Sequence, residues 1–190
     1  MIILRRLPCL ICLCTPLLLG SGLASALTLK TFNGVDGLVE SWGIFAPQST
    51  PRTTPADSTA GYHSVLQTQL VRQTRNVPIG DGVVFGYQFR ILDQDAYEAW
   101  VPVTVHYHHP RTVDHRGQPS TGFSVDITAH RQQDGSFGNG AFYVLREDFE
   151  KVPGDWQISV EYRGRTLLTK TFTLYDGTAP ASVDVARNGR

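Results

Sequence analysis

Cysteine is nearly missing from this 190-residue sequence, and its three cysteines all lie close to the N-terminus. Cys9, Cys12 and Cys14 fall in one apolar stretch that follows a short basic start. The rest of the chain can therefore form no disulfide and carry out no thiol chemistry. A domain of about 150 residues still buries roughly 68–70 % of its unfolded surface, so it can fold by apolar packing alone.

The sequence also lacks an apolar run long enough to cross a membrane, which takes about 20 residues. The apolar run over residues 7–19 follows two arginines and precedes the small residues Ala24-Ser25-Ala26. A basic start, a short apolar core and an A-x-A site are typical of a secretory signal peptide. We predict that residues 1–26 are a signal peptide cleaved after Ala26, and that the mature protein is periplasmic or secreted.

Neither sign of charge is in large excess. The sequence has 17 basic and 17 acidic residues, and removal of Arg5 and Arg6 with the signal peptide leaves 15 basic residues, a net charge near −2. No basic cluster indicates a nucleic acid or an anionic membrane surface as partner. We expect no nucleic-acid partner, no transmembrane segment in the mature chain, and a monomer.

Helical periodicity is missing as well, because no window keeps apolar residues at i, i+3, i+4 and i+7 over ten residues. Apolar and polar residues alternate instead, and the clearest such segments are residues 83–91, 101–107, 123–129 and 156–162. Further strands are expected near residues 38–45, 63–74, 139–146 and 166–175. Strands in this number, with no room for crossover helices, predict an all-β, antiparallel two-sheet sandwich of about 7–9 strands.

Three segments lack this alternation. Residues 46–61 are rich in proline and threonine and predict a long flexible loop, and residues 110–122 predict a second one. Residues 176–190 predict a disordered tail. We therefore expect one domain over residues 27–175.

The last predicted strand carries a lysine among its apolar residues. Lys170 shares a face with Leu168 and Phe172, and a lysine in that place protects an exposed sheet edge from pairing with another chain. We predict that 166–175 is an edge strand. The preceding Arg163-Gly-Arg165 predicts a tight hairpin turn.

Several short motifs follow one another along most of the chain. Trp42-Gly-Ile-Phe45 comes first, Gln73-Thr-Arg-Asn-Val-Pro78 follows, and Glu150-Lys-Val-Pro-Gly-Asp-Trp156 leads into the last strands. Over roughly residues 41–174 this arrangement resembles a family of bacterial secreted domains of unknown function, built as an immunoglobulin-like sandwich. The resemblance implies that fold and an export route. It implies no reaction and assigns no catalytic residue.

The richest cluster of metal-binding side chains is His106-Tyr-His-His109. The alternation of this strand turns its odd-numbered residues to the core, so His106 and His108 face outward with Thr104. Two outward histidines at i and i+2 can chelate a metal. His115 is a candidate third ligand, and one allowed register places Asp126 beside His106. We expect ordinary exposed histidines here and no cofactor, with a weak zinc or copper site as the alternative.

The same outward side carries a candidate binding surface. Trp100 lies on it if the strand has no bulge, and Tyr97 and Thr104 lie near it in the sequence. An outward tryptophan beside a tyrosine suits a carbohydrate or a peptide.

Catalytic motifs are missing too, since G-x-S-x-G, H-E-x-x-H, G-x-G-x-x-G and the P-loop all fail to occur. Carboxylates cluster at Asp93/Asp95 and Glu147/Asp148/Glu150, but both clusters fall in expected turns, where acidic residues are common. Asp, His and Ser in that order along a chain are no evidence for a catalytic triad unless their side chains are known to meet. These observations favour a protein that is not an enzyme, with an enzyme as the alternative.

These observations favour an exported, non-catalytic binding or accessory module of the bacterial envelope, with an envelope protein or a glycan as partner. One alternative is a metal-binding protein that uses His106 and His108. The other is a hydrolase acting on an envelope polymer, which would need a cleft.

Overall fold

The computed structural model describes residues 30–32, 34–48, 52–65 and 67–177. Within them the chain forms twelve strands, one 3-10 turn and no α-helix, which confirms the all-β prediction. No helix in these residues is long and apolar enough to cross a membrane. The predicted signal peptide and all but the first two residues of the predicted tail lie outside them.

The strands are β1 (Lys30–Phe32), β2 (Val35–Pro47), β3 (Arg52–Pro55), β4 (Tyr62–Val65), β5 (Thr68–Arg72), β6 (Asn76–Pro78), β7 (Val84–Asp93), β8 (Trp100–Val113), β9 (Pro119–Arg131), β10 (Phe137–Val144), β11 (Gly154–Tyr162) and β12 (Arg165–Tyr175), with the 3-10 turn η1 (Asp148–Glu150) before β11.

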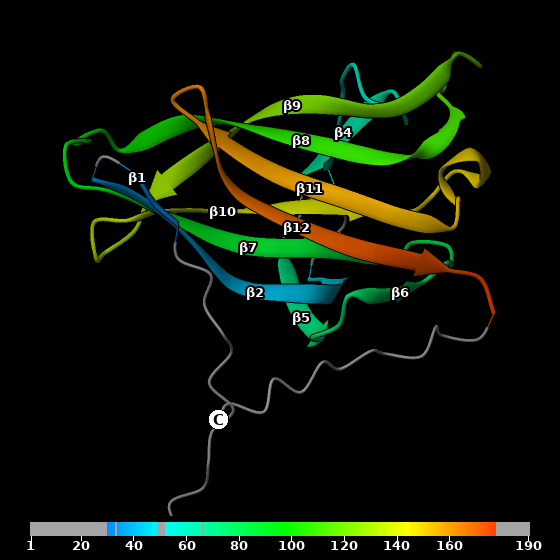
Figure 1. Ribbon diagram of the computed structural model, residues 1–190, viewed down its shortest axis with the longest axis horizontal. Coiled ribbons are helices and arrows are strands. Elements are labelled where there is room, and N and C mark those ends of the chain that lie inside the picture. Colours follow the sequence, from blue (N-terminus) through cyan, green and yellow to red (C-terminus); the bar gives the residue numbers. More distant parts are fainter. Residues whose placement is uncertain (1–29, 33, 49–51, 66, 178–190) are drawn as a thin grey trace, which may run out of the picture.

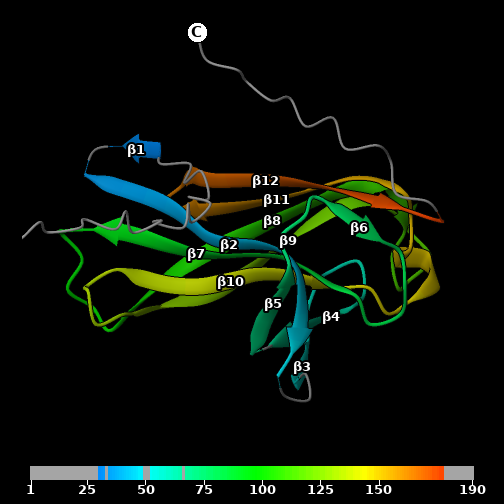
Figure 2. The same ribbon diagram turned by 90° about the horizontal axis from the view of Figure 1, so that it is seen from below.

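Ten strands form one sheet that folds into two layers, in the order β1-β2-β7-β10-β9-β8-β11-β12-β6, with β5 also paired to β2. The first layer is built on β2, β7 and β10, and the second on β9, β8, β11 and β12 (Figure 2). The β9–β10 hairpin joins the layers through only two paired positions, 130–131 and 137–138. All pairs in this sheet are antiparallel except β6 with β12. The two-sheet sandwich is confirmed.

The alternating residues meet between the layers, as predicted. Trp156 on β11 is 1 % exposed and is the centre of an aromatic cluster in the core. Its ring centroid lies 4.8 Å from that of Tyr143 and 5.7 Å from that of Phe85, which itself lies 5.5 Å from Phe172. Buried aromatic side chains of this size each contribute a few kcal/mol, so this cluster holds the layers together.

The segment predicted as a first long loop contains a strand, which corrects that prediction. Within residues 46–61, β3 pairs antiparallel with β4 to form a separate two-stranded sheet. Ser58 and Thr59 in the connecting turn are buried. The Thr59 carbonyl accepts the His115 N–H at 2.8 Å, so this turn is fastened to the end of the β8–β9 hairpin.

The second predicted loop is also mostly strand, since β8 continues to Val113 and β9 begins at Pro119. A register shift between His108 and Thr112 accommodates the proline at 110, because a bulge removes the need for its missing N–H. The remaining turn is closed by Asp114, whose Oδ1 accepts the N–H groups of Arg116 and Gln118 at 2.9 and 2.8 Å. The loop prediction for residues 110–122 was wrong because it rested on their composition, which does not show that a bulge can accommodate Pro110 within a strand.

The last strand lies at an edge, as predicted. β12 pairs with β11 along its length but with β6 only at Thr173, Leu174 and Tyr175. The turn before it is tight, and Arg163 and Gly164 both have positive φ (51° and 72°).

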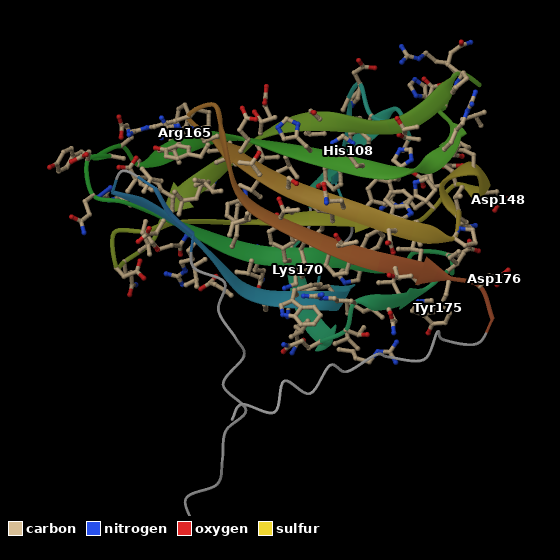
Figure 3. The ribbon with its side chains drawn as sticks, viewed as in Figure 1. His108, Asp148, Arg165, Lys170, Tyr175 and Asp176 are labelled. Atoms are coloured by element: carbon tan, nitrogen blue, oxygen red, sulfur yellow. The ribbon has the colours of Figure 1, made fainter. Side chains whose placement is uncertain are left out.

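Lys170 points from β12 into the mouth between the layers, near β2 (Figure 3). Its Nζ lies 4.1 Å from the centroid of the Trp42 ring. Burial, with a smaller contribution from the nearby Arg75 charge, lowers the pKa of Lys170 to about 8. The Trp42 ring favours the protonated amine and so opposes this shift. Burial of the charged amine is the larger effect, so the pKa is still lowered.

We expect Lys170→Met to raise the free energy of unfolding by about 1 kcal/mol at pH 7, a value reduced for partial exposure. Between pH 8 and 10.5 the unfolded chain binds the lysine proton and the folded chain releases it, so wild-type stability gains from this group as the pH rises. Urea unfolding at pH 7, 8.5 and 10 measures the effect. The advantage of the variant should shrink toward pH 10, and a constant difference across the three pH values would contradict the assignment.

Candidate functional site

The predicted strip lies on the outer face of the second layer. His108 is exposed on β8 (Figure 3). Thr104 and His106 share its side of the strand by alternation and are partly exposed. Trp100 is 54 % exposed and Tyr97, in the turn before β8, is 83 % exposed. The outward direction of these residues is confirmed, and their use as a binding surface stays a prediction.

The register predicted for Asp126 is wrong by two residues. His106 lies opposite Ser124, while Asp126 lies opposite Thr104 and accepts its hydroxyl at 2.7 Å. His115 lies in the turn after β8, and a Cβ added to Gly61 would come 2.8 Å from its ring.

No group of three or more His, Cys, Asp or Glu side chains is placed to hold a metal ion within the described ranges. His106 uses both ring nitrogens already, with Ser124 Oγ at 2.7 Å from Nδ1 and Glu161 Oε2 at 3.0 Å from Nε2. A metal on His106 would have to displace one of these partners. Weak zinc or copper binding therefore stays a prediction that the geometry does not strengthen.

The sequence assigned no role to the neighbouring histidine, His109. The alternation of this strand turns odd-numbered residues toward the core, and His109 follows that rule. It is buried, and its Nε2 and Thr59 Oγ1 lie 2.9 Å apart. Its ring centroid lies 4.8 Å from that of Trp156. Burial lowers the pKa of His109, so it is neutral near pH 7. It connects the β3–β4 turn to the core.

The two carboxylate clusters hold turns in place. Asp93 Oδ2 accepts the Tyr162 hydroxyl at 2.9 Å and pairs with Arg163 at 3.0 Å. Glu150 is fully buried in the 3-10 turn and accepts the Tyr143 hydroxyl at 2.5 Å. The carboxylates of Asp93 and Glu150 are thus occupied by structural partners.

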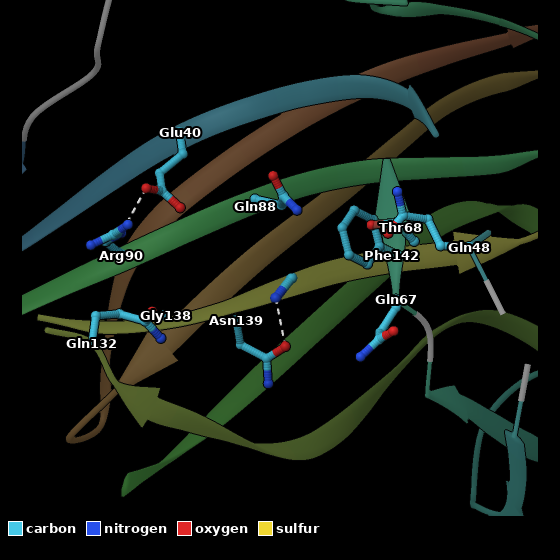
Figure 4. A pocket seen from close by; sticks show the side chains of 11 residues that line it. Glu40, Gln48, Gln67, Thr68, Gln88, Arg90, Gln132, Gly138, Asn139 and Phe142 are labelled. Carbon is cyan, nitrogen blue, oxygen red and sulfur yellow. Dashed lines mark hydrogen bonds and ion pairs between the residues drawn. The ribbon is translucent and has the colours of Figure 1, made fainter. Parts of the chain in front are cut away.

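A groove that sequence reasoning missed opens on the outer face of the first layer (Figure 4). Its volume is about 490 Å³, and strands β2, β5, β7 and β10 supply most of its surface. It is lined by Glu40, Gln48, Gln67, Thr68, Gln88, Arg90, Gln132, Gly138, Asn139, Gly140 and Phe142.

The groove is polar and carries no unpaired charge. Five of its eleven lining residues have carboxamide side chains: Gln48, Gln67, Gln88, Gln132 and Asn139. The charged residues Glu40 and Arg90 pair with each other at 2.6 Å, and Arg90 also contacts Asp134 at 2.7 Å. The hydroxyl of Thr68 is buried, and no described residue bonds to it. The lining therefore offers many donors and acceptors and little net charge.

A β-bulge in β2 sets the groove's upper wall. The register with β7 shifts between Val39 and Ser41, so Glu40 is the extra residue. Its side chain turns outward toward Arg90. The Ser41 hydroxyl donates to Gln88 Oε1 at 2.7 Å, which fixes that amide across the groove and leaves its Nε2 with no acceptor in the described part of the chain.

The floor of the groove comes from β10, where Gly138 and Gly140 have no side chains to fill it. The ring of Phe142 lies across Gly140, so that a Cβ there would collide with it. Phe142 packs edge-on against Phe45, with ring centroids 4.7 Å apart. Both glycines lie inside β10, which begins at Phe137. The glycines therefore serve a strand whose outer face is bare.

Two layers of mostly antiparallel strands packed face to face make the fold a β-sandwich. The family model "Domain of unknown function (DUF3859)" matches residues 36–174, so the chain belongs to this family. An immunoglobulin-like protein (PA1606) from Pseudomonas aeruginosa has a similar fold, with a TM-score of 0.50 and 21 % sequence identity over 81 % of this chain and 100 % of that one. No curated protein matches the sequence. The family and fold predictions are confirmed.

Proposed function

We propose that the protein is an exported binding module of the bacterial envelope, and that the groove holds a glycan without converting it. The carboxamide lining carries this proposal. Each carboxamide offers two N–H donors and a carbonyl acceptor, which match the mixed donors and acceptors of sugar hydroxyls. Since Glu40 and Arg90 neutralise each other, the lining favours an uncharged polyhydroxylated ligand over a strongly ionic one.

The aromatic ring at the end of the groove supports the same ligand class. Phe142 is partly exposed and is held in place by Phe45. A fixed aromatic ring beside polar groups suits a sugar, which has an apolar C–H face and a hydroxylated rim. The envelope location rests on the predicted signal peptide.

A printed glycan array probed with the mature protein would test the proposal, and isothermal titration would then measure the affinity of any neutral glycan found. We expect binding at submillimolar Kd. Gly138→Leu should weaken it at least tenfold, because the new side chain would project into the groove and meet only the movable end of Gln132. Gln88→Ala should weaken it by removing the amide that Ser41 orients.

The matched control is Gln157→Ala, which removes an exposed carboxamide from β11 in the other layer. It should leave the affinity unchanged. Absence of any glycan ligand, or equal affinity in Gly138→Leu and the wild type, would contradict the proposal.

A further inference from the structure

A row of three polar side chains crosses the outer face of the second layer, on the opposite side of the sandwich from the groove. Ser124 on β9, His106 on β8 and Glu161 on β11 are joined by contacts of 2.7 Å and 3.0 Å through the two ring nitrogens. The side chains of His106 and Glu161 are 29 % and 33 % exposed. A small reagent can therefore reach the row from solvent.

The protons of this row follow from its chemistry. An ionised Glu161 only accepts hydrogen bonds, so His106 Nε2 must carry a hydrogen. A neutral imidazole has one N–H, which leaves Nδ1 as an acceptor for the Ser124 hydroxyl. The serine proton thus points at a base, and a carboxylate fixes the tautomer of that base. A nucleophile, a base and an orienting group in this sequence are what activates a hydroxyl.

The position of Ser124 at a sheet edge adds hydrogen-bond donors. β9 lies at the rim of its layer (Figure 1) and pairs with β10 only at its last two residues. The Thr128 carbonyl accepts from Asn139 of β10 at 2.5 Å, so it points away from β8. Backbone groups of alternate residues point the same way in an antiparallel strand. The N–H groups of Asp126 and Ser124 therefore face the rim, where no described strand pairs with them.

We propose that Ser124 is an activated nucleophile and that this face of the protein hydrolyses small carboxylic esters. Ser124 Oγ bonds to the ester carbonyl carbon while its proton passes to His106 Nδ1. The C–O bond to the alcohol then breaks, and His106 returns the proton to the departing alkoxide. Water attacks the acyl-serine in the same way, which releases the acid and restores Ser124. The rim N–H groups stabilise the negative oxygen that forms in each half-reaction. Glu161 is a positioning residue that acts through His106.

A fluorophosphonate probe followed by peptide mass spectrometry would show whether Ser124 is reactive, and p-nitrophenyl acetate would measure turnover. We expect one label per chain, on Ser124, and turnover that falls at least tenfold in Ser124→Ala and in His106→Gln. Glu161→Gln should lower kcat with little change in KM, since it orients the base without touching the ester, and Glu161→Asp should recover part of the loss.

The matched control is Ser159→Ala. Ser159 lies opposite His106 on β11, but its hydroxyl contacts Thr169 at 3.0 Å. That variant should keep full labelling and turnover. A label absent from the wild type, or equal turnover in Ser124→Ala and Ser159→Ala, would overturn the proposal. Gly138→Leu should leave ester hydrolysis intact and Ser124→Ala should leave glycan binding intact, so the two functions can fail separately.

Discussion

Replacement of Trp156 by alanine is expected to lower the free energy of unfolding by about 3–5 kcal/mol. The side chain is 1 % exposed and contacts rings from three other parts of the chain, Phe85, Tyr143 and His109. These rings belong to both layers, so no single strand can shift to fill the space. The loss therefore combines the transfer energy of a large side chain with an unfilled cavity. Urea unfolding followed by circular dichroism measures it.

Trp100→Ala is the matched control, because it deletes the same atoms from a side chain that is 54 % exposed. We expect it to change stability by no more than about 0.5 kcal/mol. Trp156→Phe should recover part of the loss, since it refills part of the cavity. A Trp156→Ala protein within about 1 kcal/mol of the wild type would show that the aromatic cluster does not join the layers.

The sequence predicted which face of each strand is buried better than it predicted which residues are neighbours. The alternation over residues 101–107 placed His106 and His108 outward, and the structure agrees. The expected partner, Asp126, was two residues from the actual one, Ser124. Side chains repeat every two residues along a strand, so a register shift of two leaves every face unchanged. Periodicity alone therefore could not choose between these neighbours.

The predictions made from composition were wrong for the two segments that contain proline. Residues 46–61 and 110–122 were expected to be loops, but strands occupy residues 52–55 and reach to Val113 on β8. Proline is excluded only where its missing N–H would be needed, and a bulge or an edge meets that condition. The bulge between His108 and Thr112 depends on how β8 meets β9, which local sequence does not reveal.

The groove could not be predicted for a related reason. Its lining comes from four strands, from Gln48 and Gln67 between β2 and β5, and from the turn before β10. Its upper wall depends on the bulge at Glu40, which reverses the alternation of β2 so that Trp42 rather than Gly43 faces the core side. The alternation over residues 83–91 was enough to predict that the side chains of Gln88 and Arg90 point outward. Their meeting with Gly138 and Phe142 required the β7–β10 register.

Replacement of Glu150 by alanine is expected to cost about 3–4 kcal/mol, although the sequence placed this residue in a solvated acidic turn. Glu150 is fully buried, and its Oε1 accepts the Tyr143 hydroxyl at 2.5 Å. Its Oε2 accepts the N–H groups of Arg146 and Glu147 at 3.0 and 2.9 Å. Truncation removes one buried and two partly buried hydrogen bonds at once, and each lost bond costs roughly 1 kcal/mol or more.

The neighbouring Asp148 provides the comparison for Glu150, because its side chain is 99 % exposed in the same 3-10 turn and pairs with Lys151 at 2.7 Å. Asp148→Ala should cost far less than Glu150→Ala, because an exposed ion pair contributes little to stability. Glu150→Gln keeps a carbonyl acceptor and should fall between the two alanine variants. Chemical unfolding of all three proteins at pH 7 ranks them. Equal stability of Glu150→Ala and Asp148→Ala would mean that the buried carboxylate does not hold the turn that leads into β11 and its Trp156.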